Sequence, residues 1–223
     1  MPYIKSNRNI LHKTKKIAIF ASGSGSNFKS IHRHVQSGEI PARIILAVSN
    51  NPDSGAIEYA KGNNISTLII NEICYPNSIV REKLLILSLK ENDVDLICLA
   101  GYMKLLPKSI IDQYQKSILN VHPALLPQFG GKGFYGIKVH EAVIASGATK
   151  SGVTVHFVDE KYDNGEIIAQ EKVEVRINDT PETLAERVLK VEHKLYPQVL
   201  KAFCENRILW KNNHPIIEGA IEN

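Results

Sequence analysis

The sequence predicts an α/β fold with a doubly wound, mostly parallel sheet, helices on both faces and an antiparallel strand pair in the C-terminal half. Short β-prone runs alternate with helix-like segments through the first half of the chain. These runs are apolar at successive positions, as expected when helices cover both faces of a sheet. Two longer strand-like runs then follow one another across an acidic turn, which favours an antiparallel pair. Together these patterns are typical of a Rossmann-like fold.

The first half contains four strand-like runs and three helix-like ones. In the first helix-like segment, Phe28, Ile31 and Val35 recur at spacings of three and four, which predicts one apolar stripe. Each crossover contains a helix, so the strands are expected to be parallel. The predicted strands cover 16–21, 42–49, 66–70 and 95–100, and the predicted helices cover 27–35, 54–61 and 78–92.

Beyond Leu106 the alternation is less regular. The last long helix is expected to begin after Thr180, which can cap it, with Pro181 in its first turn. Pro197 falls within this helix and is expected to bend it or end a segment of it. The polar tail after Trp210 predicts no element. The other expected elements are helices over 107–114 and 139–146, strands over 117–121, 151–158 and 166–175, and a glycine-rich loop over 128–136.

Composition predicts one globular domain. With 223 residues and 43% hydrophobic content the chain can bury a single core, which we place over 16–223 after a flexible leader over 1–15. The net charge of +4 is scattered, so it does not indicate a nucleic-acid partner. Cys74, Cys98 and Cys204 match neither a disulfide framework nor a zinc site and indicate a reducing cytosol. No apolar run reaches membrane-spanning length.

The segment Ala21-Ser-Gly-Ser-Gly-Ser-Asn27 joins the first predicted strand to the first predicted helix. Free backbone N–H groups and the helix dipole attract a phosphate at such a place. A dinucleotide fingerprint needs a third small residue where this chain has Phe28, so a monophosphate is favoured. The alternative is a glycine-rich turn that only connects strand to helix.

The segment Ile118-Leu-Asn-Val-His-Pro-Ala-Leu-Leu-Pro127 is the most informative in the chain. On a strand, Asn120 and His122 point to the same face. An amide donor beside an imidazole suits acyl transfer, because one stabilises an oxyanion while the other moves a proton. The alternative is a pair that satisfies buried backbone groups. Asp163 lies in an acidic turn, where a solvated carboxylate is the usual outcome, but beside His122 it would raise the pKa of the imidazole.

Other histidines and one glutamate have weaker claims. His32 and His34 do not share a helix face, so no metal site is predicted there. His156 lies between apolar neighbours on a strand, where a packed or hydrogen-bonded histidine is the more usual case. His140 and His193 lie on predicted helices, and Glu192 interrupts an apolar stretch, which gives it a mild claim to bind a ligand.

These motifs, in this order, resemble the phosphoribosylglycinamide formyltransferase family of folate-dependent enzymes. The resemblance covers roughly 16–209. The Asn-x-His-Pro-x-Leu-Leu-Pro motif is shared with other formyltransferases, so only the combination of motifs is specific. The matching segments are 21–27, 99–103, 120–127, 152–158, 162–165 and Glu192-His193.

The resemblance implies roles for individual residues. The phosphate of the ribonucleotide substrate would bind Gly25, Ser26 and Asn27, and Glu192 would contact the rest of it. The catalytic residues would be Asn120, His122 and Asp163. The half over 16–106 would then bind phosphate, and the half over 107–223 would bind folate and carry the chemistry. On the folate side the family pattern matches Met103, Lys104, Leu105 and Leu106, together with Asn120 and the closing loop of Asp159, Glu160, Lys161, Tyr162 and Asp163.

The chain departs from the family pattern at two places. An arginine that grips the folate in many relatives aligns with Ser78, and Arg81 or Lys83 are the candidates to substitute for it. The glycine-rich loop over 128–136 is longer than in the shortest members, and its expected effect is on mobility near the site.

The resemblance implies transfer of a formyl group from 10-formyltetrahydrofolate to the primary amine of 5′-phosphoribosylglycinamide in purine biosynthesis. Asn120 and protonated His122 would stabilise the oxyanion while Asp163 helps to move the proton, without a metal. We expect a cytoplasmic enzyme with small-molecule partners only, as a monomer or weak homodimer. The alternatives are a formyltetrahydrofolate hydrolase, a methionyl-tRNA or sugar-nucleotide formyltransferase, and a non-catalytic nucleotide-binding module. Length argues against the first two, which usually carry an additional domain.

Overall fold

The computed structural model describes residues 14–219, so the leader expected over 1–15 lies almost wholly outside the described residues. A seven-stranded sheet has the strand order β3-β2-β1-β4-β5-β6-β7. The strands from β1 to β5 are parallel, and β6 and β7 are antiparallel to their neighbours, which confirms the predicted sheet. The strands are β1 Lys15–Phe20, β2 Ala42–Ser49, β3 Ser66–Ile69, β4 Leu96–Leu99, β5 Ile118–His122, β6 Lys150–Phe157 and β7 Ile167–Glu174.

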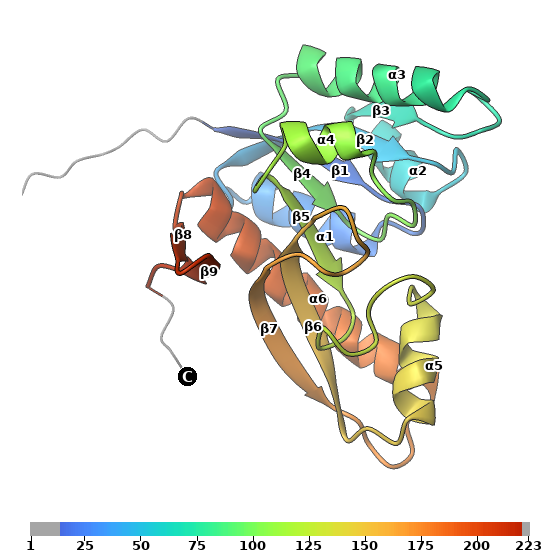
Figure 1. Cartoon of the computed structure of the whole chain (residues 1–223), viewed down its shortest axis with the longest axis vertical. Coiled ribbons are helices and arrows are strands. Elements are labelled where there is room, and N and C mark those ends of the chain that lie inside the picture. The colour runs from blue at the N-terminus through green and yellow to red at the C-terminus, as the bar shows by residue number, and fades with distance from the viewer. Residues whose placement is uncertain (1–13, 220–223) are drawn as a thin grey trace, which may run out of the picture.

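Helices cover both faces of the sheet (Figure 1). One buried cluster joins the sheet to α1, α2, α5 and α6, and a second joins the opposite face to α3 and α4. The predicted doubly wound arrangement is therefore confirmed. The helices are α1 Ser26–Gln36, α2 Gly55–Gly62, α3 Ser78–Glu91, α4 Lys108–Gln113, α5 Ile137–Ala145 and α6 Pro181–Cys204.

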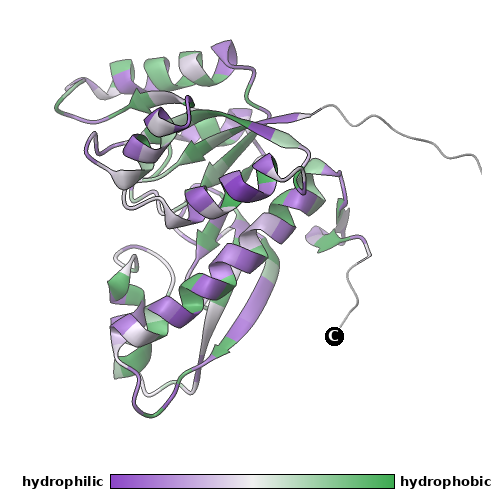
Figure 2. Ribbon diagram, turned by 180° about the vertical axis from the view of Figure 1, so that it is seen from behind, coloured by the Kyte–Doolittle hydropathy of each residue, from purple (hydrophilic) through white to green (hydrophobic). Residues whose placement is uncertain are grey.

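Successive side chains of the central strands point to opposite faces of the sheet, which explains the two clusters. In β1, Ile17 and Ile19 pack toward α1 and α6, whereas Ala18 and Phe20 pack toward α3 and α4. The central strands are accordingly hydrophobic, while outward turns of the long helix are hydrophilic (Figure 2). Cys98 is buried in β4, as expected for a packed thiol, and burial raises its pKa.

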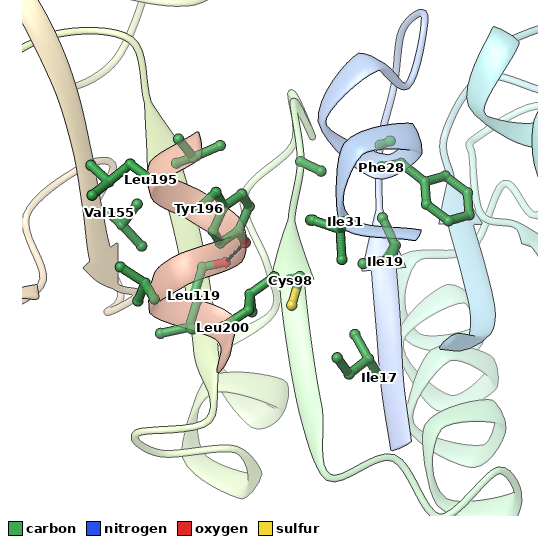
Figure 3. Packing of buried hydrophobic residues seen from close by; sticks show 14 of the residues in the cluster. Ile17, Ile19, Phe28, Ile31, Cys98, Leu119, Val155, Leu195, Tyr196 and Leu200 are labelled. Carbon is green, nitrogen blue, oxygen red and sulfur yellow. Dashed lines mark hydrogen bonds between the residues drawn. The ribbon is translucent and has the colours of Figure 1, made fainter. Parts of the chain in front are cut away.

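Tyr196 of α6 ties this helix to the middle of the sheet. Its hydroxyl is fully buried and lies 3.0 Å from the carbonyl oxygen of Leu119 (Figure 3). The same hydroxyl lies 3.2 Å from the carbonyl oxygen of Leu99. These two carbonyls belong to β4 and β5, the neighbouring parallel strands. The helix is therefore held in position by a directional contact as well as by apolar packing.

The start of α6 agrees with its prediction, and of the two effects expected of Pro197 one is excluded. Thr180 accepts a hydrogen bond from the backbone N–H of Thr183, and Pro181 is in the first turn. The helix continues through Pro197 to Cys204, so the proline does not end a segment. Proline lacks an N–H, which leaves the carbonyl of His193 without its helical donor. The hydroxyl of Ser30 on α1 donates to that carbonyl instead, at 3.0 Å.

The polar tail contains a small hairpin that the sequence pattern did not predict. Strands β8 Ile208–Lys211 and β9 His214–Ile217 are joined by Asn212 and Asn213, which both have positive φ. A two-residue turn of this kind suits an antiparallel hairpin. Trp210 stacks on Phe157 with ring centroids 5.3 Å apart, so the hairpin is attached to β6. Within residues 14–219, none of the helices has the length and hydropathy needed to cross a membrane.

Candidate active site

A cavity of about 660 Å³ opens where the parallel strands end. Ligands of doubly wound sheets bind in this region, beyond the carboxyl ends of the strands. The cavity is lined by α1, the turn after β4, the end of β5, the loop over 128–136, α5, the β6–β7 loop and α6. It therefore brings together seven predicted site residues, namely Asn27, Met103, Asn120, His122, Tyr162, Asp163 and Glu192.

Asn120 is held by the histidine directly opposite it on β6. Asn120 and His156 are partners in the antiparallel register. Nδ1 of His156 donates to the carbonyl of Phe157 at 2.6 Å, so its Nε2 accepts from Nδ2 of Asn120 at 3.0 Å. The second N–H of the amide points to Oδ1 of Asp163 at 3.3 Å, a longer bond. The amide thus has a defined orientation, and the longer bond is the easier one for a ligand to replace.

His122 lies on the same face of β5, as the strand alternation predicted. Its Nε2 donates to the carbonyl of Phe129 at 2.8 Å, and its Nδ1 lies 3.5 Å from Oδ2 of Asp163. Burial lowers the pKa of His122 and outweighs the opposing effects of Asp163 and the Phe129 carbonyl. Asp163 therefore has the expected effect of raising the pKa of His122, but burial is the larger effect and the net pKa is lowered.

Asp163 belongs to the site and is not a solvated turn residue. Its backbone has a positive φ of 51°, and its Oδ2 accepts from the backbone N–H of Gly131 at 2.9 Å. Burial raises the pKa of Asp163, but the nearby imidazoles of His156 and His122 and the hydrogen bond from the Gly131 N–H outweigh this, so the net pKa is lowered. The carboxylate thus links β5, β6 and the glycine-rich loop.

The glycine-rich loop is attached to the candidate catalytic residues. His122 donates to the carbonyl of Phe129, and Asp163 accepts from the N–H of Gly131. Phe129 has φ 56° and Gly131 has φ 94°, so both residues adopt a left-handed conformation. The two contacts hold the loop over the reaction end of the cavity.

The other end of the cavity lies at the start of α1. Gly25 caps the helix with φ 74° and has no side chain to satisfy the first N–H groups, which leaves them for an anion. Asn27, in the first turn, donates to the buried carboxyl group of Glu192 on α6. Burial raises the pKa of Glu192, and the Asn27 bond opposes this only in part. Oδ1 of Asn27 is buried without a partner in the described residues, so it is available to a bound donor.

The residues expected on the folate side lie around two further cavities. A cavity of about 650 Å³ is lined by Ser78, Arg81, Lys104 and Leu105, among others, but not by Lys83. A smaller one of about 60 Å³ is lined by Leu106, Asn120, Lys161, Tyr162 and Asp163, among others. Tyr102 lines all three cavities, and Met103 lines the first. The three cavities therefore lie next to one another around the turn after β4.

Two residues of the expected folate set face other partners. Asp159 accepts from the N–H of Lys161 at 2.9 Å and from Nδ2 of Asn164 at 2.7 Å, which stabilises its own loop. Glu160 pairs with Lys108 of α4. Neither carboxylate lines any of the three cavities.

Three residues of the site have a part in it that the sequence patterns did not predict. His156 is buried and hydrogen-bonded, as expected, and in addition it orients Asn120, which lies opposite it in the strand register. Tyr102 lies in the matching segment 99–103 but was given no role, and His140 lines the main cavity without a motif that singles it out. Over residues 14–219, no group of three or more His, Cys, Asp or Glu side chains is arranged to hold a metal ion.

Comparison with known proteins agrees with this geometry. The formyl transferase family model matches residues 15–200. The chain is 49% identical to a chloroplastic phosphoribosylglycinamide formyltransferase of Arabidopsis thaliana, over 93% of this chain and 72% of that protein. It is 39% identical to the Bacillus subtilis phosphoribosylglycinamide formyltransferase, over 84% of this chain and 93% of the relative.

A solved structure shows the same arrangement of elements. Glycinamide ribonucleotide transformylase 1 from Symbiobacterium toebii superposes with a TM-score of 0.84 at 33% identity, covering 92% of this chain and 94% of the other. Sequence and structure therefore give the same answer: the chain belongs to the formyl transferase family, among its phosphoribosylglycinamide formyltransferases.

Proposed function

We propose that this protein transfers the formyl group of 10-formyltetrahydrofolate to the primary amine of 5′-phosphoribosylglycinamide, a step of purine biosynthesis. One observation carries the proposal. A single cavity has Asn120, His122 and Asp163 at one end and Asn27 and Glu192 at the start of α1. An amine that is anchored through its phosphate at one end would present its nitrogen to the reactive groups at the other.

The acceptor binds along the cavity between α1 and α6. Its phosphate lies at the N-terminus of α1, on the backbone of Gly25 and Ser26 and beside Asn27. Glu192 accepts a hydrogen bond from the sugar or amide portion, in exchange for part of its bond to Asn27. This assignment uses both the free N–H groups of the helix and the buried polar pair.

The formyl donor binds on the other side of Tyr102. Met103 and Tyr162 contact its ring system from two loops, and Lys104, Leu105 and Leu106 continue that wall. The anionic tail reaches the 650 Å³ cavity, where Arg81 lies three residues beyond Ser78 on α3. Arg81 already bonds to the carbonyls of Tyr75 and Pro76, which orients its guanidinium. It is thus a better substitute for the family arginine than Lys83.

The chemistry needs no covalent enzyme intermediate. The amine attacks the formyl carbon, and the oxyanion that forms accepts from the Asn120 amide in place of the long bond to Asp163. His122, neutral at the start because burial lowers its pKa, takes the proton that the amine loses, with Asp163 beside it. The imidazolium then stabilises the oxyanion and returns the proton to the leaving nitrogen of the folate. One N–H and one C–N bond are broken, and one of each is formed.

A tetrahydrofolate-release assay tests the function. We expect release from 10-formyltetrahydrofolate only when phosphoribosylglycinamide is present, in equal amount to formylated product. Release without the amine would instead indicate a hydrolase, and no release in either case would indicate a binding module.

The setting of the enzyme is part of the same proposal. We place it in the cytoplasm as one domain over 16–223, with the halves 16–106 and 107–223 binding phosphate and folate respectively. Its three cysteines are free, and two of them are buried, which fits a reducing compartment. The plant relatives are chloroplastic by name, so fractionation of the source cells decides the compartment. Light scattering distinguishes a monomer from a weak homodimer.

A further inference from the structure

His140 is a buried histidine that the proposed reaction does not use. It lies in the first turns of α5, with a side chain that is 4% exposed. The ring lines the same cavity as His122 and is near enough to influence it electrostatically. Its Nδ1 is buried without a hydrogen-bond partner in the described part of the chain.

A purely structural role does not account for this ring. Buried polar groups in native proteins nearly always have partners, because an unsatisfied one loses its bonds to water without replacement. His32 provides the contrast within the same molecule, since it is also buried on a helix but its Nδ1 bonds to Tyr59 at 2.9 Å. His140 has no such partner, and its ring borders an empty space large enough for a substrate.

The position of His140 identifies which substrate it meets. Helix α5 packs against α6, and α6 lines the cavity with Ala185, Leu189 and Glu192. This is the wall assigned to the acceptor in the proposed function. The wall assigned to the formyl donor, with Met103 and Tyr162, comes from other loops. His140 therefore belongs to the acceptor side, close to the end where His122 lies.

The ring is also in a suitable protonation state. Burial, together with the nearby His122, lowers the pKa of His140 to about 4. At neutral pH it is an uncharged imidazole with one N–H donor and one lone pair. Such a ring can bond to an amine or an amide without competing with His122 for a proton.

We propose that His140 hydrogen-bonds to the amine-bearing arm of the acceptor and is a specificity-determining residue for it. The inference rests on the proposed function and adds a contact on the acceptor side beyond Asn27 and Glu192. The contact positions the amine for attack, and the formyl donor does not share it.

Steady-state kinetics of two variants test the inference. His140→Leu removes both ring nitrogens, and we expect the KM for phosphoribosylglycinamide to rise tenfold or more, with the KM for 10-formyltetrahydrofolate unchanged within twofold. His140→Gln restores a polar group at similar reach and should recover part of that loss. His32→Gln is the matched control, because it removes a buried helical histidine away from the cavity, and both KM values should stay within twofold.

A second measurement does not depend on the stability of the variants. In wild-type protein with ¹⁵N-labelled histidine, phosphoribosylglycinamide alone should shift the ring nitrogens of His140, and the folate alone should not. Unchanged KM values in His140→Leu, equal rises in both KM values, or no ring shift would overturn the inference while leaving the proposed function intact. Wild-type protein that transfers no formyl group would overturn both.

Discussion

The two halves of the sheet differ in what their strands present to either side. In β1 and β4 every buried position is apolar or a thiol, and helices pack on both faces. In β5, Leu119 and Val121 keep the apolar face toward α6, but Asn120 and His122 occupy the other face. That face meets the loops over 128–136 and 159–165, whose Phe129 and Asp163 contact these two side chains. We call the first half the scaffold half, because helices cover both faces of its strands, and the second half the site half, because loops cover the polar face of β5; the start of α1 still lines the cavity from the scaffold half.

Polar groups are buried in this fold where loops, and not helices, cover a strand. A helix covering a strand offers apolar side chains and has no free backbone groups, so it favours apolar partners. A loop offers unpaired N–H and C=O groups, as Gly131 and Phe129 do, and these satisfy a buried imidazole and carboxylate.

Asp163→Asn should have the largest effect on turnover. Loss of the carboxylate removes help with proton transfer, which contributes about a hundredfold or more, while both KM values should change little. Steady-state kinetics measure this. Glu166→Gln is the control, because Glu166 is an exposed carboxylate near the end of the same loop that pairs with His214. Near-normal turnover of Asp163→Asn would contradict the assigned role.

Acid should weaken the fold through its buried histidines. The folded pKa of His140 is about 4, below the ordinary value of 6.5, so its contribution to stability is complete above pH 6.5 and declines as the pH falls. At pH 4 this residue should lower the free energy of unfolding by about 3 kcal/mol relative to neutral pH. His122 and His193, whose pKa values are also lowered, act in the same direction. Urea unfolding at pH 7 and pH 4 measures the loss, which should be smaller in His140→Gln; an identical loss would exclude His140 as a source.

Gly25→Ala, in the scaffold half, should lower the free energy of unfolding by about 2 kcal/mol, because a residue in the left-handed conformation gains a side chain. An added Cβ would lie 2.9 Å from Cα of Ala56, on the backbone at the start of α2, and φ is 74°. Gly23→Ala is the control, since nothing lies within 4 Å of its added Cβ. We expect a change below about 0.5 kcal/mol there. Equal losses in urea unfolding would argue against the close approach of the two helices.

His156→Phe should have the smallest of these effects, a loss of about tenfold in kcat from one hydrogen bond that orients Asn120. His156 acts through Asn120, so both KM values should remain close to wild type. His156→Gln offers an acceptor oxygen to the Asn120 amide and should recover part of the loss. A rise in KM instead of a fall in kcat would show that His156 contacts substrate.

The scaffold half was almost fully predictable from the sequence, and the site half only in part. Strand β2 was predicted at its observed bounds, because unbroken apolar runs bounded by turn residues are strong local signals. The common face of Asn120 and His122 followed from strand alternation. The position of Asp163 beside these two residues did not follow from any local pattern, because Asp163 lies 41 or more residues further along the chain, in a left-handed turn. The C-terminal hairpin was missed, and the stacking of Trp210 on Phe157 that attaches it to β6 joins residues far apart in the sequence.

The hydroxyl of Tyr196 has a consequence for substrate length. Tyr196 lies one helical turn after Glu192, and its hydroxyl contacts the carbonyl of Leu119, the residue before Asn120. The span from Glu192 to Asn120 is therefore set by one side chain and one strand. In the proposed reaction this fixed distance selects the acceptor by its length. An acceptor with one more methylene between its sugar and its amine would carry the nitrogen past the formyl carbon. Discrimination by length then needs no additional contact with the substrate.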